Sequence, residues 1–258
     1  MNNLVDEVYD VITNGGVGFN FKETSLHILK DKIEITGQIQ FNQIYEEVQL
    51  QDEYSIQILF PTDFPNTIPI VREISGRIES SADYHNNKEN DGFCLGVPGE
   101  IHKKIHKNPT FKYFISEIVI PFLYANTFRE KYKKYPWTTR AHFGIGLIEY
   151  YQNLFNLENE ELTKKFLYNI AISKEAIKGH IQCPCGSGKK FRNCHRPLYT
   201  KLITYHSHND VQKDVLYILK DDTTLNLDKI FREKMHTKKW YKLYRICLIQ
   251  IIRRKKIK

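Results

Sequence analysis

The stretches LFPTDFPNTIPIV (residues 59–71) and YHNNKENDGFCLG (residues 84–96) decide the fold of this 258-residue chain. Three prolines fall within nine residues of the first stretch. Proline fixes φ and donates no backbone hydrogen bond, so this segment must leave any sheet as a stiff, irregular loop. The second stretch is polar and holds Cys94, a cysteine far in sequence from the others.

Upstream of the prolines, hydrophobic residues recur with a period of two. Residues 33–41 and 54–60 alternate apolar and polar side chains, a pattern typical of strands with one buried and one solvated face. Residues 70–74 predict one more strand, and helical spacing predicts an amphipathic helix at residues 2–13. The pattern therefore predicts an antiparallel meander preceded by a helix.

Downstream of the second stretch the pattern becomes helical. Residues 80–110 are polar and punctuated by glycine and proline, so we expect them to be mostly irregular. Helical spacing returns at residues 111–123, where Pro121 should kink or end the helix. Further helical segments are predicted at residues 145–155, 160–172 and 201–252. The predicted fold class is therefore α+β.

Composition and charge restrict the class of protein. Hydrophobic residues make up 41% and charged residues 26% of the chain, as in soluble globular proteins. We expect no membrane association and a cytoplasmic location, because no run of 18 apolar residues and no basic, apolar leader occurs. Residues 1–100 carry 6 Lys and Arg against 17 Asp and Glu (net −11), and residues 101–258 carry 32 against 13 (net +19). The basic half is suited to nucleic acid or an acidic partner, although a solvated lysine-rich surface accounts for the same charge.

One short segment has the spacing of a metal site. Its ligand types are those of a tetrahedral zinc site, and the glycines between them allow tight turns. The candidate ligands are Cys183, Cys185, Cys194 and His195. Residues 181–197 closely resemble the SEC-C motif, which implies a small zinc-stabilised knob that docks onto other macromolecules. Because four protein ligands fill the coordination shell, we expect the zinc to be structural; a redox-active thiol pair is the alternative.

The two opening stretches together resemble the ubiquitin-conjugating enzyme family, whose members read F-P-x-x-[YF]-P-x-x-x-P, then Y-H-P-N, a glycine, and a catalytic cysteine followed by leucine. The first block matches at Phe60, Pro61, Asp63, Phe64, Pro65 and Pro69. The second block matches at Tyr84, His85, Gly92, Cys94 and Leu95. In element order the resemblance extends over residues 1–130.

This resemblance implies that Cys94 carries a ubiquitin-like protein as a thioester and transfers it to an amine or other acceptor. The implied partners are the ubiquitin-like protein, a separate activating enzyme and a target protein. The family's asparagine stabilises the oxyanion of the transfer step. Asn87 takes that place if His85 is the anchor, whereas Asn86 does if the count starts from Cys94. Together with the SEC-C motif, the resemblance implies a bacterial conjugation system, some of which act in anti-phage defence.

Three departures from the family pattern leave alternatives open. The proline after His85 is absent, one residue is missing between Gly92 and Cys94, and residues 71–84 form a longer segment than usual. The chain is then either an active enzyme or an inactive adaptor that binds proteins or nucleic acid. A packing role for Cys94, an RNA- or ribosome-associated zinc protein, and a Cys–His protease are further alternatives. Nearby histidines for a protease are His85, His102 and His106.

The predicted architecture has four parts. A ubiquitin-conjugating-like domain, an antiparallel meander with flanking helices, is expected over residues 1–135. The parts that follow are a helical segment, the zinc knob and a basic helical tail, over residues 136–180, 181–197 and 198–258.

Overall fold

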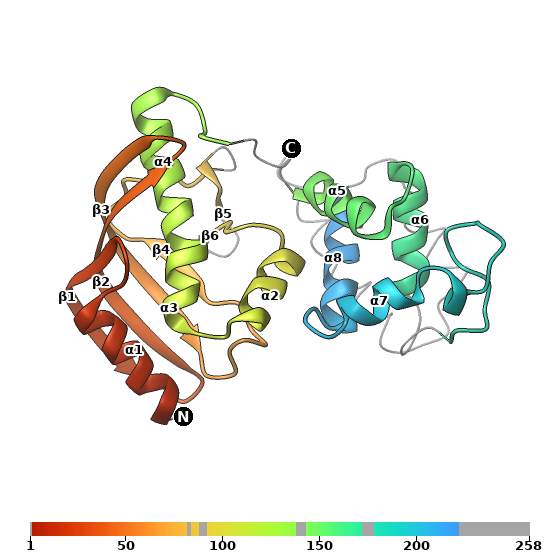
Figure 1. The fold of residues 1–258 in the computed structure, drawn as a ribbon, viewed down its shortest axis with the longest axis horizontal. Coiled ribbons are helices and arrows are strands. Elements are labelled where there is room, and N and C mark those ends of the chain that lie inside the picture. Colours follow the sequence, from red (N-terminus) through yellow and green to blue (C-terminus); the bar gives the residue numbers. More distant parts are fainter. Residues whose placement is uncertain (1, 82–83, 88–91, 138–142, 172–177, 222–258) are drawn as a thin grey trace, which may run out of the picture. The chain divides into compact units, whose positions relative to one another are not determined.

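The computed structural model describes residues 2–81, 84–87, 92–137, 143–171 and 178–221. The chain divides into two compact units, Met1–Thr139 and Arg140–Lys258. Each unit has its own fold and is described by itself (Figure 1). The last part of the predicted basic tail, residues 222–258, lies outside the described residues.

Unit 1 is built on a four-stranded antiparallel sheet in the order β1-β2-β3-β4. The predicted alternation is confirmed, because Tyr54, Ile56, Ile58 and Phe60 are all buried. The strands are β1 (Phe19–Ile28), β2 (Lys32–Tyr45), β3 (Val48–Pro61) and β4 (Ile70–Glu73). The prolines that follow β3 form the loop to β4, as the sequence predicts.

Strand β1 was not predicted by the sequence pattern, and its geometry explains why. Its register against β2 shifts between Lys22 and Ser25, and Glu23 within this bulge has φ 47°. A bulge inserts an extra residue and breaks the period of two. Only Phe19 and Phe21 of this strand are buried, so the hydrophobic pattern is too short to predict it.

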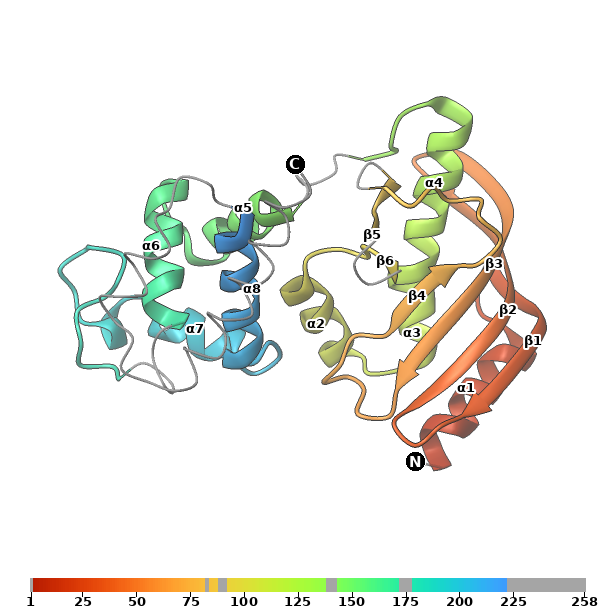
Figure 2. The same cartoon turned by 180° about the vertical axis from the view of Figure 1, so that it is seen from behind.

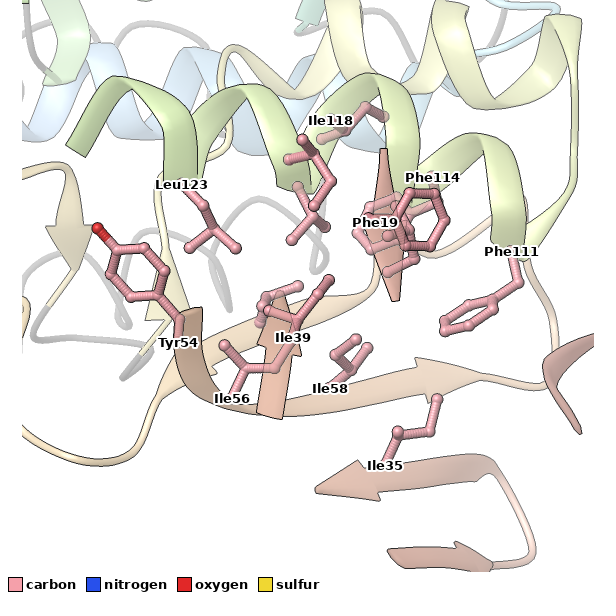
Figure 3. Close-up of a cluster of buried hydrophobic side chains, with 14 of the residues drawn as sticks. Phe19, Ile35, Ile39, Tyr54, Ile56, Ile58, Phe111, Phe114, Ile118 and Leu123 are labelled. Carbon is pink, nitrogen blue, oxygen red and sulfur yellow. The ribbon is translucent and has the colours of Figure 1, made fainter. Parts of the chain in front are cut away.

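Helices cover one face of this sheet. The predicted N-terminal helix is α1 (Asn2–Asn14), and the predicted stripe at 111–123 forms α3 (Phe111–Phe114), the π-helical segment η2 (Ile115–Val119) and α4 (Ile120–Tyr132). Figure 3 shows Phe111, Phe114 and Leu123 pointing from this helical run toward Ile35, Ile39, Ile56 and Ile58 of the sheet. The opposite face is covered by no described helix of unit 1 (Figure 2). Unit 1 is thus a two-layer α/β arrangement with its core between the layers.

Pro121 does not end the helix. It is the second residue of α4, directly after the π-helical segment. A proline donates no hydrogen bond to the preceding turn, and a π-helical turn changes the local hydrogen-bond spacing. The helix therefore continues to Tyr132 and keeps its apolar stripe on the sheet.

The expectation that residues 80–110 are mostly irregular is wrong. Strands β5 (Asn86–Asn87) and β6 (Gly92–Phe93) pair as a small antiparallel sheet, and helix α2 spans Pro98–Lys107. Proline is favoured in the first turn of a helix, where its missing N–H has no partner to lose. Pro98 therefore begins a helix within a segment that we had expected to be irregular.

Unit 2 is helical in its described part. The helices are α5 (Phe143–Phe155), α6 (Glu160–Ala171), the 3-10 turn η3 (Phe191–Asn193), α7 (Arg196–Leu202) and α8 (His208–Asp221). The predicted helices at 145–155 and 160–172 are confirmed. Helices α5, α6 and α8 pack against one another around a core that includes Tyr151, Phe155, Phe166 and Val211.

A buried polar contact joins two of these helices. The hydroxyl of Tyr151 donates to Asp214 Oδ2 at 2.7 Å, and His206 Nε2 lies 2.9 Å from the same oxygen. All three residues are buried. Buried polar groups are costly unless paired, so this contact fixes how α8 sits on α5. None of the described helices of either unit has both the length and the apolar composition that a membrane span requires.

Candidate thiol site and candidate metal centre

The β5–β6 hairpin brings the predicted site residues of unit 1 together. Asn86 pairs with Phe93 and Asn87 pairs with Gly92. The next cross-strand contact is a hydrogen bond of 2.6 Å from the Cys94 backbone N–H to the His85 carbonyl. The loop cysteine is therefore placed directly opposite the predicted His-Asn-Asn segment by backbone pairing.

Alternation along the hairpin separates the two asparagines. Phe93 is buried and stacks on Phe122 of α4, with ring centroids 4.3 Å apart. Its partner Asn86 uses its side-chain amide to donate to the Ile78 carbonyl at 3.3 Å. Successive side chains of a strand point to opposite faces. Since Phe93 and Asn86 share the inner face, Cys94 and Asn87 share the outer one.

Cys94 is exposed, and its surroundings affect its acidity in two opposing ways. The protein atoms packed around it raise the pKa of the Cys94 thiol above its ordinary value. A hydrogen bond from the Gly96 backbone acts in the opposite direction and is the weaker effect. Gly96 has φ 139°, which favours glycine. At neutral pH the thiol therefore keeps its proton.

An aromatic and cationic cluster lies beside the hairpin. The guanidinium carbon of Arg129 is 3.8 Å from the ring centroid of Tyr84 and 5.1 Å from that of Tyr135. The ring of His85 lies 5.4 Å from that of Tyr135. His85 itself has φ 51°, an uncommon left-handed conformation for a residue with a side chain. Sequence spacing does not connect Arg129 or Tyr135 with Cys94, because both lie more than 30 residues downstream.

In unit 2, the four predicted metal ligands converge. The ligand atoms of Cys183, Cys185, Cys194 and His195 all lie within 4.8 Å of one another. His195 Nδ1 is 3.2 Å from the sulfur of Cys183 and 3.2 Å from that of Cys194. This donor set, three thiols and one imidazole nitrogen, is compatible with tetrahedral zinc.

The second nitrogen of His195 supports this fit. Nε2 lies 2.8 Å from the carbonyl oxygen of Phe155, the last residue of α5. A carbonyl can only accept, so Nε2 carries the proton and Nδ1 is left with its lone pair toward the thiols. Ligating histidines are commonly oriented by such a contact. The imidazole is therefore prepared to bind a metal through Nδ1.

The loop between the ligands is shaped by backbone contacts. The Cys183 N–H donates to the Lys189 carbonyl at 2.8 Å, and the Gly186 N–H donates to the Cys183 carbonyl at 3.2 Å. Gly186 and Gly188 have φ 79° and 73°, conformations that side chains disfavour. These turns fold the thirteen-residue span back on itself so that its first and last ligands, Cys183 and His195, meet.

Because the thiols lie close together, the pKa values of Cys183 and Cys185 differ. Burial raises the pKa of Cys183 to about 12. Burial acts on Cys185 in the same direction, but hydrogen bonds from Ser187 and from the neighbouring thiols outweigh it and lower its pKa to about 6. These neighbouring thiols share protons in hydrogen bonds with one another. A metal ion that displaced those protons would let all the thiols ionise, since zinc ligation deprotonates thiols.

Comparison with known families identifies one part of the chain. Residues 182–197 match the model of the SEC-C motif. This span contains all four converging ligands, so the predicted motif is confirmed, together with a Cys3His cluster compatible with zinc. No curated protein and no solved structure matches the chain.

Proposed function

We propose that unit 1 is a ubiquitin-conjugating-like domain that carries a ubiquitin-like protein as a thioester on Cys94. The observation that carries this proposal is the hairpin register, which puts Asn87 and Cys94 on one outer face. The order of elements also agrees with the family resemblance. A helix, three strands, a proline loop, a fourth strand, a cysteine-bearing hairpin, a short helix and a long helical run follow one another.

The chemistry consists of two acyl transfers. The Cys94 sulfur, as thiolate, attacks the carbonyl carbon of a thioester held by a separate activating enzyme. A new S–C bond forms, the old one breaks, and the proton lost by Cys94 ends on the departing thiol. An acceptor amine then attacks the same carbonyl, forms the C–N bond and releases Cys94, and the amine proton passes to the sulfur.

Asn87 is the better candidate for stabilising the oxyanion of the second step. It is diagonal to Cys94 across the hairpin, and such neighbours have Cα atoms about 7–8 Å apart. A carbonyl bonded to the Cys94 sulfur would extend into that space, where an amide N–H can donate to the developing negative charge. Asn86 is committed to the Ile78 carbonyl on the inner face, so we assign it a structural role.

The residue missing between Gly92 and Cys94 does not remove the cysteine from the hairpin. Gly92 and Phe93 form β6, and Cys94 follows immediately with its N–H bonded to His85. The shorter spacing therefore agrees with a functional placement of the thiol. This favours an active enzyme over the alternative, an inactive adaptor.

The test uses the purified chain with its ubiquitin-like protein, the activating enzyme and ATP. We expect an adduct that reductant removes from the wild type, and an ester that resists reductant in Cys94→Ser. The matched control is Cys247→Ser, which should keep the reducible adduct. If no adduct forms with every partner present, or if it survives in Cys94→Ala, unit 1 is not a thioester carrier.

We further propose that the zinc knob of unit 2 is a docking surface for an acidic protein partner. Residues 178–201 contain six Lys or Arg and no Asp or Glu. All six cations are exposed: Lys178, Lys189, Lys190, Arg192, Arg196 and Lys201. Two hydrophobic side chains, Ile181 and Leu198, are also exposed there, at 40% and 39%. A rigid basic surface with apolar contacts is suited to bind such a partner.

This docking proposal also covers the adaptor alternative, in which the chain only holds partners together. Binding to the acidic partner should weaken with rising salt and with the double substitution Arg192→Ala, Arg196→Ala, whereas zinc content should stay unchanged. Equal binding by this variant would exclude the knob as the contact surface. Preferential binding of an RNA duplex over an acidic protein would instead favour a nucleic-acid role.

A further inference from the structure

Residues 74–81 follow β4, and Arg77 within this segment contacts two other elements of unit 1. Arg77 contacts β3 through Asp52, with Nη1–Oδ1 and Nη2–Oδ2 distances of 2.9 and 2.6 Å. It contacts α4 through Glu130, with Nε–Oε1 and Nη2–Oε2 distances of 3.2 and 2.7 Å. Its Nη1 also donates to the Glu53 carbonyl at 2.9 Å. We call this set of contacts the Arg77 clamp.

The clamp uses the full donor capacity of the guanidinium. An arginine has five N–H donors in a planar fork, and the five contacts above employ all of them. The guanidinium carbon also lies 4.2 Å from the ring centroid of Tyr54. A lysine cannot reproduce such a bidentate arrangement. Only an arginine at position 77 can therefore make all of these contacts.

The same segment is fixed from its other side by Glu73. Its Oε1 accepts from the Ser75 backbone N–H at 2.7 Å, and its Oε2 accepts from the Arg77 N–H at 2.8 Å and from the Ile78 N–H at 3.4 Å. Ile78 is 5% exposed and belongs to the core. The clamp and the Glu73 contacts together hold the Ile78 main chain in place.

The β5–β6 hairpin is hydrogen-bonded to the main chain of this segment. The Ile78 carbonyl accepts from the Asn86 side chain at 3.3 Å, and the Ser81 carbonyl accepts from the Asn86 N–H at 3.1 Å. Asn86 begins β5, and His85 next to it accepts from the Cys94 N–H. A continuous series of contacts thus runs from Arg77 through Ile78 and Asn86 to Cys94.

We propose that Arg77 is a positioning residue for thioester transfer, which holds the outer face of the hairpin in the geometry that brings Asn87 to the thioester carbonyl on the Cys94 sulfur. This inference rests on the proposed function of unit 1. Arg77 acts through Ile78 and Asn86 and touches no reacting atom. A misplacement of about 1 Å at a reacting centre can slow a reaction about a hundredfold. The oxyanion contact should therefore be the step that suffers when the clamp is lost.

The experiment compares Arg77→Ala, Arg77→Lys and the wild type in the full-length chain. The matched control is Ile35→Val or Ile35→Ala, whichever lowers the melting temperature by as much as Arg77→Ala does. Ile35 is suitable because it is buried in the central strand β2, away from the clamp. The first readout is amide hydrogen exchange of the peptide 84–95. The second is the rate at which the charged thioester is discharged by free lysine.

We expect Arg77→Ala to speed exchange of this peptide about tenfold and to slow discharge about tenfold, with smaller effects in Arg77→Lys. The Ile35 control should change the exchange rate and the discharge rate only as far as its loss of global stability accounts for. If Arg77→Ala and the control behave alike in both readouts, the inference is overturned. Should Arg77→Ala not fold, the Arg77→Lys comparison decides in the same way.

The two readouts distinguish this inference from the proposed function. Absence of a thioester in the wild type would reject the proposed function, and the exchange measurement would still decide whether Arg77 holds the hairpin. A normal thioester in the wild type with unchanged discharge in Arg77→Ala would reject the positioning role alone.

Discussion

Under the proposed function, the raised pKa of Cys94 would affect both the loading and the holding of the thioester. A protonated thiol is a weak nucleophile, so the unloaded chain should resist adventitious electrophiles at neutral pH. A thiol with a high pKa is also a poor leaving group, which keeps the loaded thioester from being discharged without a positioned acceptor. Reactivity then depends on the partners that approach this face.

We predict that alkylation of Cys94 by iodoacetamide rises about tenfold for each pH unit and does not level off by pH 9, because the thiol pKa lies above its ordinary value of 9.0. The measurement is peptide-resolved mass spectrometry of the zinc-loaded protein. A synthetic peptide of residues 90–98 serves as the control and should level off near the ordinary thiol pKa. A plateau at or below neutral pH in the folded protein would contradict this prediction.

The acid response of unit 1 should depend on Asp52. Partial burial acts to raise the pKa of Asp52, but hydrogen bonds from Arg77 and from Thr127 outweigh it, so the pKa lies below 3.8. A carboxylate with a lowered folded-state pKa contributes stability above its unfolded pKa and loses it as pH falls through the folded one. Asp52→Asn should therefore cost about 1–3 kcal/mol at pH 7 and clearly less near pH 2. Urea unfolding at both pH values checks this, with Asp63→Asn as the control; equal costs at both would contradict it.

At the scale of elements, the pairing of β1 with β2 requires their backbones to come close together at Gly37. Gly37 of β2 lies against the bulge of β1, where a Cβ atom would come within 2.8 Å of Thr24 Oγ1, 2.9 Å of Thr24 Cα and 3.0 Å of the Lys22 carbonyl oxygen. Two of these three atoms belong to the backbone. A side chain at this position would therefore have to move the strand rather than a flexible group.

We predict that Gly37→Ala destabilises unit 1 by about 1–3 kcal/mol, the usual cost of overpacking. Thermal unfolding measures the loss, and the neighbouring Gln38→Ala should stay within about 0.5 kcal/mol of the wild type. A second expectation is that the loss appears in β1, as faster hydrogen exchange of residues 19–28. Equal stability of the two variants would show that the bulge yields without cost.

The elements that sequence reasoning predicted are those whose periodicity is unbroken. The central strands and the helices α1, α5 and α6 were predicted because their buried faces repeat at a fixed spacing. Strand β1 was missed because its bulge interrupts the repeat, and α2 because Pro98 starts a helix as easily as it ends one. Among the site residues, the zinc ligands were predictable from spacing alone. Arg77 and Arg129 were not, since their partners lie in distant segments of the chain, Asp52 and Glu130 for Arg77 and Tyr84 for Arg129.

At the scale of the whole molecule, the chain combines units that are stabilised in different ways. Unit 1 has a continuous hydrophobic core between its sheet and helices. The knob of unit 2 has few buried apolar groups, among them Phe191 and Cys183, and is tied to α5 through His195 and Phe155. Short segments with little core commonly depend on a structural metal. Metal removal should therefore act on one unit only.

We predict that a chelator lowers the melting temperature of unit 2 and leaves that of unit 1 unchanged. Zinc bound only by the folded knob stabilises that fold by mass action, so its removal takes away that contribution. Trp137, packed on Tyr45 and Tyr124 within unit 1, reports on unit 1 by fluorescence once Trp240 is replaced by Phe. Circular dichroism reports on the helices of both units.

The double variant Cys183→Ser, Cys185→Ser should mimic the chelator and lose about one zinc per chain by metal analysis. Lys189→Ala, on the same loop, should retain both zinc and melting behaviour. His195→Ala tests the link to α5, because it removes a ligand and the contact with the Phe155 carbonyl together, and it should lower the unit 2 transition at least as far as the chelator does. A zinc-depleted chain that melts like the loaded one would show that the Cys3His cluster does not stabilise unit 2. A shift of the Trp137 transition would show instead that the stability of the two units is coupled.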